Sequence, residues 1–202
     1  MSIPQKVGLV NELFNQLDKE INLFQKSTNL GCIKGCGKCC NKPDIYASPL
    51  EFLPWAFHVF LNNQAIDKLD KLKNTTSTIC NIFDPLTIID KVNGKCSDYT
   101  HRGLICRLFG FAANRDKYGK LKLATCTVIK EGQKEDFELA NQAITEQLEV
   151  PIFTDYYMKL SQIDYRLATE SVLINQAMIL ALEEVLQYYA YRPYPTKLKI
   201  VA

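Results

Sequence analysis

The cysteines are the residues of this chain whose type and spacing point to chemistry. Four of the eight, Cys32, Cys36, Cys39 and Cys40, lie in the short run GCIKGCGKCC. Thiolates are soft ligands that bind zinc or iron–sulfur clusters, and short C-x(2–4)-C spacings let one loop supply several ligands to one centre. The interleaved glycines can adopt positive φ and donate amide hydrogen bonds to sulfur. The run therefore predicts a metal-binding loop.

The other four cysteines are Cys80, Cys96, Cys106 and Cys126. We expect each of them at the end of a short strand, where ligands from distant segments can converge with the loop on one closed site or on two adjacent ones. Eight thiolates suffice for two four-coordinate centres. Cys80 and Cys126 have apolar neighbours in the sequence, so the alternative for these two is that they are small packing residues.

The order of these cysteines resembles the bacterial CxxCxxCC family, which is described as zinc- or iron-chelating. Its members carry a clustered C-x(2–3)-C-x2-C-C, then a lone cysteine, then a segment of the form C-x-x-Y-x-x-R-P-x-x-C-R. The second motif is matched in spacing by Cys96, Tyr99, Arg102, Cys106 and Arg107. The resemblance covers residues 30 to 130 and implies metal binding, without implying any particular reaction. It departs at Gly103, where the family usually has proline, so we expect a looser approach to Cys106.

Three residues of the second motif are candidates for the surroundings of a metal. Arg102 and Arg107 can offset the negative charge of a thiolate centre and donate to sulfur, or they can be solvated surface arginines. Tyr99 either hydrogen-bonds the same groups or packs. His101 can replace a thiolate or relay protons, although an ordinary loop histidine is the favoured interpretation. We expect a purely structural role for His58.

Helices must hold this segment on both sides. Apolar residues recur every three or four positions from 5 to 28, which predicts an amphipathic helix that stops by Gly31. Ser48-Pro49-Leu50-Glu51 reads as a capping box that begins a second helix, which Pro54 should kink or shorten. A further helix is expected over residues 64–73. After residue 133 helix returns to residue 148, Pro151 interrupts it, and a wide apolar stripe from 163 to 189 predicts a buried helix.

The middle of the chain predicts two small hairpins. In the first, residues 86–92 precede a tight turn at Asn93-Gly94 that leads to Cys96. In the second, strands over 107–113 and 121–128 end near Cys126. The expected fold class is mainly α with a small β insertion (α+β). We expect a single domain over residues 1–202, in which the N-terminal helix and the C-terminal helices flank a metal-binding segment at about residues 30–130.

The composition of the chain indicates which kinds of partner the protein can bind and in which cellular compartment we expect it. The chain has 202 residues, a net charge of +2 and interspersed acidic and basic side chains, so nothing indicates nucleic-acid binding. Its longest apolar stretch, residues 177–182, is far shorter than a membrane span. We therefore expect a cytoplasmic protein, in which a disulfide framework is disfavoured because the compartment is reducing.

Three functions fit these residues. The favoured one is an iron–sulfur protein, with [4Fe-4S] as the expected cluster, that serves electron transfer or a redox or modification reaction with an unknown protein or redox partner. The compact loop favours it over the second, a zinc-binding structural or interaction module, because zinc ribbons usually have two separated C-x2-C knuckles. The third, a radical S-adenosylmethionine enzyme, uses a similar three-cysteine spacing but usually needs repeated β/α units.

Overall fold

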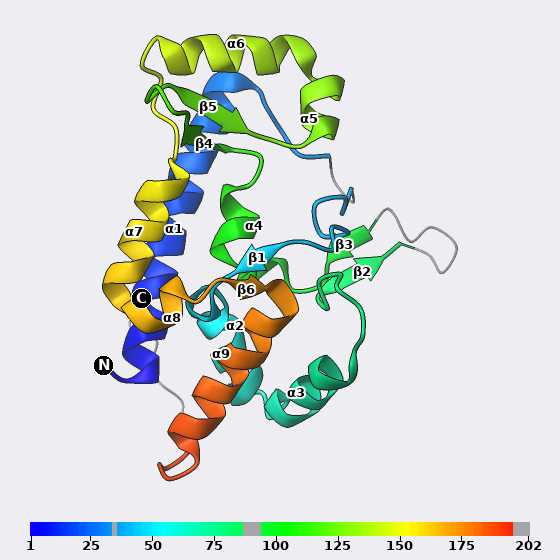
Figure 1. Cartoon of the computed structure of the whole chain (residues 1–202), viewed down its shortest axis with the longest axis vertical. Helices are drawn as coiled ribbons and strands as arrows, with labels where there is room; N and C mark the ends of the chain where they lie inside the picture. The colour runs from blue at the N-terminus through cyan, green and yellow to red at the C-terminus, as the bar shows by residue number, and fades with distance from the viewer. Residues whose placement is uncertain (34–35, 87–93, 196–202) are drawn as a thin grey trace.

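A long N-terminal helix runs along most of the molecule and carries both of its apolar cores (Figure 1). The computed structural model describes residues 1–33, 36–86 and 94–195. Helix α1 (Ile3–Thr28) begins with the side chain of Ser2, which accepts from the backbone N–H of Gln5 in a capping box. It ends at Thr28, as predicted, and the residue that terminates it is Asn29, which adopts the left-handed conformation (φ 57°).

The larger core joins the first part of α1 to the second and last helices of the chain. The expected capping box at Ser48 and Glu51 is confirmed and opens a 3-10 turn, η1 (Pro49–Phe52), followed by α2 (Leu53–Leu61). Pro54 lies in the first turn of α2, where a proline breaks no helical hydrogen bond. Helices α3 (Ala65–Asn74) and α9 (Ile174–Tyr189) complete this part, and α2 packs against α9.

The smaller core lies at the far end of α1. A hairpin of β4 (Ala112–Arg115) and β5 (Leu121–Ala124) leads into α5 (Thr127–Gly132) and α6 (Lys134–Thr145), at the top of Figure 1. Its buried side chains are those of Phe24, Leu30, Leu123, Ile129, Ala140 and Ile144. Phe24 and Leu30 come from the end of α1 and the residues after it, so the start of the cysteine loop is anchored in this second core.

The C-terminal apolar stripe is divided among several elements instead of forming one helix. Helix α7 (Phe153–Ile163) packs along α1, and α8 (Tyr165–Thr169) begins at Asp164, whose side chain accepts from the N–H of Leu167 at 3.0 Å. Strand β6 (Val172–Leu173) then pairs with β1 (Tyr46–Ala47) before α9 starts. The interruption arises because Asp164 caps a new helix.

Both predicted hairpins exist, with shifted boundaries. Strand β2 (Phe83–Pro85) pairs with β3 (Gly94–Cys96), and Gly94 lies opposite Pro85, so Gly94 is a strand residue and not the turn residue that we predicted, while Asn93 lies outside the described residues. The predicted strand over 86–92 lies outside the described residues, apart from Leu86. In the second hairpin the strands are shorter than predicted, because residues 107–108 belong to α4 (Leu104–Leu108) and residues 127–128 to α5.

The architecture is therefore mainly α with small β elements, as predicted. Every sheet in the described ranges is a two-stranded antiparallel pair, which is not the parallel β/α arrangement of radical S-adenosylmethionine enzymes. Within the same ranges, no helix combines the length and the apolar character needed to cross a membrane.

Candidate metal centre

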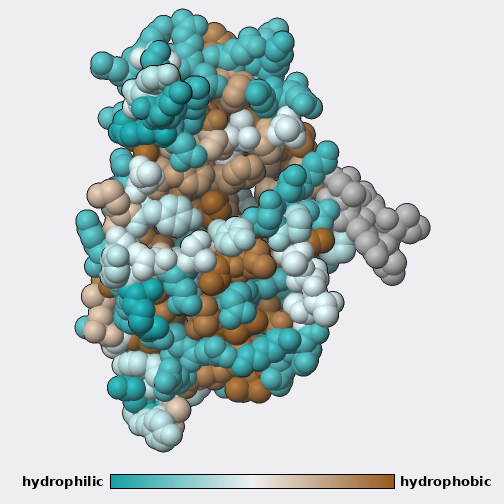
Figure 2. All heavy atoms as spheres, in the orientation of Figure 1, coloured by the Kyte–Doolittle hydropathy of each residue, from teal (hydrophilic) through white to brown (hydrophobic). Residues whose placement is uncertain are grey.

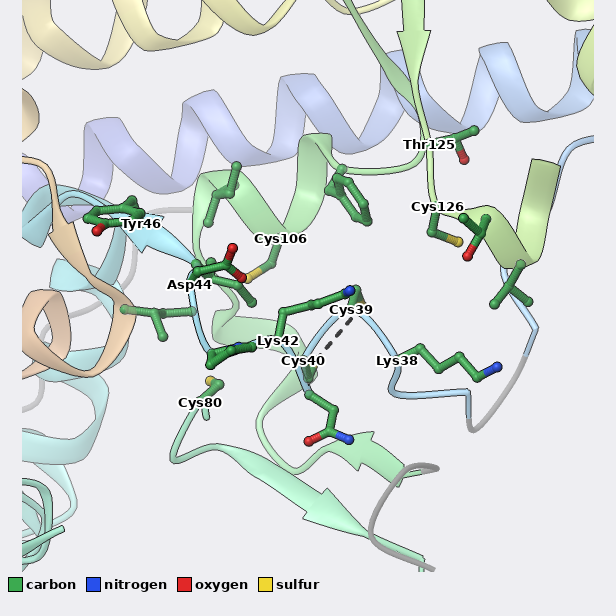
Figure 3. A pocket seen from close by; sticks show the side chains of 18 residues that line it. Lys38, Cys39, Cys40, Lys42, Asp44, Tyr46, Cys80, Cys106, Thr125 and Cys126 are labelled. Carbon is green, nitrogen blue, oxygen red and sulfur yellow. Dashed lines mark hydrogen bonds between the residues drawn. The ribbon is translucent and has the colours of Figure 1, made fainter. Parts of the chain in front are cut away.

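An apolar cavity opens between the two cores, and most of the cysteines face it. Its volume is about 840 Å³, and Figure 2 shows it as a hollow with apolar side chains around it. Ile45, Ile105, Phe109, Val128 and Ile174 supply its apolar wall. Five cysteines line it, namely Cys39, Cys40, Cys80, Cys106 and Cys126 (Figure 3). Segments far apart in the sequence thus bring thiols to one hollow, as the cysteine pattern predicted.

A tight turn presents the central pair of cysteines. The N–H of Cys40 donates to the carbonyl of Gly37 at 2.9 Å, and Gly37 has φ +58°. A Cβ atom built on Gly37 would lie 2.7 Å from the carbonyl oxygen of Gly94 and 2.6 Å from the ring of Phe83. Only glycine permits so close an approach at this φ. The turn is therefore seated directly on the β2–β3 hairpin.

The same hairpin carries two further cysteines. Cys96 is the last residue of β3 and lies opposite Phe83 in the ladder. Cys80 precedes β2, and its carbonyl accepts from the N–H of Phe83 at 3.0 Å. Cys80 is buried, whereas Cys96 is half-buried. Both lie at the strand ends, as predicted.

Cys106 lies on a helix, which corrects the expectation that it ends a strand. It belongs to α4, which begins at Gly103. The φ of Gly103 is −64°, the value that proline fixes, so the backbone here follows the path that the family's proline would impose. A Cβ at this position would lie 2.9 Å from the ring of Phe52. The loop is thus closely packed, in contrast to the looser approach that we expected.

A buried carboxylate fixes the start of α4. Glu51 is fully buried, and one of its carboxylate oxygens accepts from the N–H of Ile105 at 2.8 Å. The other accepts from the N–H of Ser48 at 2.8 Å and from its hydroxyl at 3.1 Å, and the Tyr157 hydroxyl also bonds to this carboxylate. Since Ile105 directly precedes Cys106, this network ties a candidate ligand to the helical core.

The remaining cysteines lie towards the smaller core. Cys126 follows β5 as the N-cap of α5, and Cys32 follows Gly31. Gln133, just after α5, makes two hydrogen bonds to Gly31: its amide donates to the carbonyl at 2.7 Å, and its oxygen accepts from the N–H at 2.9 Å. This pair of bonds holds the beginning of the cysteine loop against α5.

The cysteine thiols influence one another. All eight are free thiols, and the sulfurs of Cys39 and Cys40 lie 4.0 Å apart. The hydrogen bond between these two thiols lowers the pKa of Cys39 and raises the pKa of Cys40. Burial raises the pKa of Cys80 to about 11, and burial followed by neighbouring negative charge raises that of Cys106 well above its usual value. Cys39 is therefore the more acidic thiol of the pair and the first available metal ligand.

The donor chemistry fits zinc or an iron–sulfur cluster, because both are held by thiolates and several free thiols surround one apolar hollow. Lys38 and Lys42 also line the hollow and place positive charge near it. Among residues 1–33, 36–86 and 94–195, no three cysteine, histidine or acidic side chains already lie close enough together to hold one ion. Binding must therefore draw the sulfurs together.

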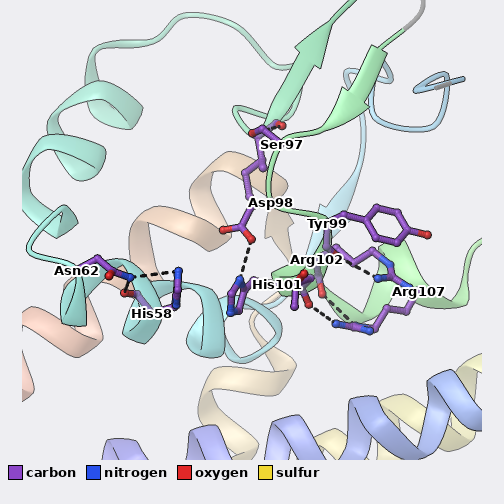
Figure 4. Close-up of polar contacts among 10 residues, drawn as sticks. His58, Asn62, Ser97, Asp98, Tyr99, His101, Arg102 and Arg107 are labelled. Atoms are coloured by element: carbon purple, nitrogen blue, oxygen red, sulfur yellow. Dashed lines mark hydrogen bonds and ion pairs between the residues drawn. The ribbon is translucent and has the colours of Figure 1, made fainter. Parts of the chain in front are cut away.

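The two arginines of the second motif donate their hydrogen bonds to oxygen (Figure 4). Burial raises the pKa of Cys96, and the positive charge of Arg102 opposes this rise, as expected for an arginine that offsets thiolate charge. Arg107 is buried, pairs with Asp18 of α1, and donates to the carbonyls of Thr100 at 2.7 Å and Arg102 at 3.2 Å. Arg102 lies 3.4 Å from Asp18 and stacks over the ring of Tyr99 at 4.0 Å. All hydrogen bonds recorded for these two guanidinium groups go to oxygen, so they brace the loop that carries Cys96 and Cys106.

The histidines form a separate stacked pair. His101 Nδ1 lies 2.7 Å from Asp98, and its ring stacks on that of His58 at 4.2 Å. His58 also bonds to Asn62, and burial, followed by the neighbouring His101, lowers the pKa of His58. Neither histidine is among the residues lining the cavity. The position of His58 agrees with the structural role expected for it. His101 was expected as an exposed loop histidine, but its side chain is only 25% exposed because it packs on His58 and pairs with Asp98.

Sequence reasoning missed four contributors to the site. Glu51 was recognised only as part of a capping box, and Gln133 only as the start of a helix. Asp18 pairs with an arginine 89 residues away, and no local pattern could reveal this. Lys42 follows the cysteine run closely, so its position was the one usable signal.

Comparison with known proteins identifies one family. The family model CxxCxxCC, described as "Putative zinc- or iron-chelating domain", matches residues 31–127. The match spans all eight cysteines and ends just after Cys126. Neither the curated proteins nor the solved structures contain a match to this chain.

Proposed function

Since residues 31–127 match the model of the CxxCxxCC family, whose description is "Putative zinc- or iron-chelating domain", we propose that this protein holds an iron–sulfur cluster through its cysteine thiolates. The proposed use is electron transfer, or a redox or modification reaction, with a protein redox partner. The proposed ligands come from the eight cysteines. One observation carries the choice of a cluster: five of them line an apolar cavity of about 840 Å³, which is far larger than one ion requires.

The cavity wall suits such a group. Apolar side chains lower the local dielectric, and burial, net charge and hydrogen bonds to sulfur set the potential of a cluster. When bound, the cluster supplies one-electron chemistry. The chain itself supplies thiolates and positive charge from Lys38 and Lys42, and it keeps water from the side of the cavity that Ile105 and Phe109 cover.

Protons must leave as ligands bind. Burial raises the pKa values of Cys80 and Cys106 and keeps these two thiols protonated until metal arrives, whereas the hydrogen bond with Cys40 lowers the pKa of Cys39 and eases its deprotonation. Metal loading should therefore release protons and become tighter as pH rises.

A zinc centre is the second candidate, and a specific distance favours it. Four sulfurs around zinc at about 2.3 Å lie about 3.8 Å from one another. The Cys39 and Cys40 sulfurs are 4.0 Å apart, so this pair is already close to the edge of a zinc tetrahedron. Zinc would make the protein a structural or interaction module.

The test is an ultraviolet–visible spectrum of anaerobically purified protein, with elemental analysis for iron, zinc and sulfide. A broad visible absorbance that dithionite bleaches, with iron and sulfide in the protein, supports the cluster. A colourless protein with stoichiometric zinc replaces it with the zinc module. Protein with neither metal contradicts both. His58→Ala is the control, because His58 lies outside the cavity lining and should change none of these readings.

A further inference from the structure

The two ends of the cysteine loop are held by different parts of the molecule. The first end is fixed to the smaller core by the two hydrogen bonds between Gly31 and Gln133, at 2.9 and 2.7 Å. Because Gln133 follows α5 and Cys126 is the N-cap at the other end of that short helix, the residue after Gly31, Cys32, is held towards the same helix as Cys126.

The second end is fixed to the β2–β3 hairpin. Gly37 leaves no room for a Cβ against Gly94 and Phe83, so the turn that ends in Cys40 cannot shift along the hairpin. That hairpin carries Cys80 and Cys96, and Cys106 lines the same cavity beside Cys40 and Cys80. Figure 3 shows Cys80 and Cys106 on one side of the Cys39–Cys40 pair and Cys126 on the other.

The adjacent cysteines stand between these two groups. Cys36 and Cys39 have the C-x2-C spacing by which one turn supplies two ligands to the same metal. Cys39 therefore goes with Cys36. Cys40 lies next in the chain, and it lines the cavity together with Cys39, Cys80, Cys106 and Cys126. Since Cys39 is assigned to the first group by its spacing from Cys36, Cys40 is left for the second. Assigning Cys39 to one group and Cys40 to the other leaves four thiolates in each, and it excludes the arrangement in which both sulfurs, 4.0 Å apart, bind one zinc ion.

Resting on the proposed function, we propose that the domain holds two separate metal centres, each closed by four thiolates. The first is formed by Cys32, Cys36, Cys39 and Cys126, and the second by Cys40, Cys80, Cys96 and Cys106. The Cys39-Cys40 peptide bond joins them. Four protein ligands leave no open position on either metal, so both centres suit electron transfer or structure, not substrate binding at the metal.

The test is metal content per chain in single serine variants of the full-length protein, purified anaerobically. Cys32→Ser should lose about half of the metal of the unaltered protein, because Cys32 is exposed and its replacement leaves the second group intact. Cys96→Ser should also lose about half. The double variant Cys32→Ser/Cys126→Ser should lose no more than Cys32→Ser, whereas Cys32→Ser/Cys96→Ser should lose nearly all.

Two outcomes overturn the partition while leaving the proposed function standing. If Cys32→Ser or Cys96→Ser alone removes all metal from a chain whose helical circular dichroism is retained, there is a single centre. If Cys32→Ser keeps all of its metal, Cys32 is not a ligand. Absence of metal from the unaltered protein overturns the proposed function and the partition with it.

Discussion

The helical core and the cysteine face of this protein are held by different forces. In the core, side chains such as Val10, Leu17 and Leu53 are fully buried among helices α1, α2 and α9. On the cysteine face, most thiols are half-buried or exposed, and the chain is fixed by a few polar anchors at Gly31 and Glu51. Burying a large apolar side chain contributes about 1.5–3 kcal/mol, whereas one hydrogen bond contributes about 1 kcal/mol net.

This difference separates folding from metal binding. Apolar burial can stabilise the helical core without metal, while the cysteine face retains sulfurs that a metal must draw together. The anchors bring the loop to its place but do not complete the centre. Variants of the core should therefore change stability, and variants of the anchors should change metal retention more than stability.

The largest effect is expected in the core. Leu17→Ala should lower the free energy of unfolding by about 2–5 kcal/mol, because it leaves a cavity at a fully buried position. Leu23→Ala, on the same helix but 65% exposed, should change it by less than about 0.5 kcal/mol. Urea denaturation measures both. An equal loss of unfolding free energy in the two variants would contradict the assignment of Leu17 to the buried face of α1 and of Leu23 to its exposed face.

The pH dependence of the free energy of unfolding should reveal the raised pKa of Glu51, which links the helical core to the cysteine face. Burial raises the pKa of Glu51 above its ordinary value of 4.5. At pH values between the ordinary pKa of the unfolded chain and the raised pKa of the folded chain, Glu51 has released its proton in the unfolded chain but keeps it in the folded chain. The free energy of unfolding therefore falls as pH rises through this range, by up to about 1.4 kcal/mol per pH unit. Glu51→Gln should remove this slope.

Urea denaturation at several pH values above 4.5 measures this slope. Glu138→Gln is the control, since Glu138 is exposed on α6 and should leave the slope as it is. A Glu51→Gln protein with an unchanged slope would show that the carboxyl of Glu51 titrates normally in the folded chain.

Gly37→Ala should weaken metal binding more than folding. The added Cβ would strike Gly94 and Phe83 and lift the Cys39–Cys40 turn off the hairpin. A displacement of groups that support ligands typically costs about 10–100-fold in metal affinity. Gly119→Ala is a matched control, because Gly119 also has positive φ (+80°) but faces open space. Competition with a chelator measures the metal affinity. Equal losses of affinity in Gly37→Ala and Gly119→Ala would refute a special role for the close packing of Gly37 on the hairpin.

Gln133→Ala should lower the free energy of unfolding by about 2 kcal/mol, at the low end of the loss expected for Leu17→Ala, because it removes the two hydrogen bonds to Gly31. Its effect on metal should be confined to the first proposed centre, so chelator should remove about half of the metal faster than in the unaltered protein. Gln142→Ala, which breaks only an exposed contact to Glu146 on α6, is the control. Faster loss of all the metal would contradict two separate centres.

Local patterns predicted much of the fold. The spacing of Val7, Val10, Phe14 and Leu17 predicted α1, and Ser48 with Glu51 predicted the start of the next helix, because these signals act within a few residues. The same kind of reasoning misplaced Cys106 on a strand. The helix there is short, and its first turn depends on Glu51, a residue far away in the sequence.

The arginines illustrate the same limit at the site. Their motif spacing identified Arg102 and Arg107 as notable residues, but it could not determine which groups they contact. Asp18 forms an ion pair with Arg107 because α1 packs close to the segment that carries Arg102 and Arg107. Only the packed structure brings this acidic side chain next to the arginine. The expected contacts with sulfur remain a prediction for the metal-bound protein.

By itself, the sequence determined the kind of ligand, since thiolates in a short glycine-rich loop favour zinc or iron whatever surrounds them. It also determined the helices, whose apolar period is local. Only the tertiary structure decided which cysteines face one another. Gly31 is fixed to Gln133 and Gly37 to the β2–β3 hairpin by contacts between distant segments, and such pairings form only when the cores pack.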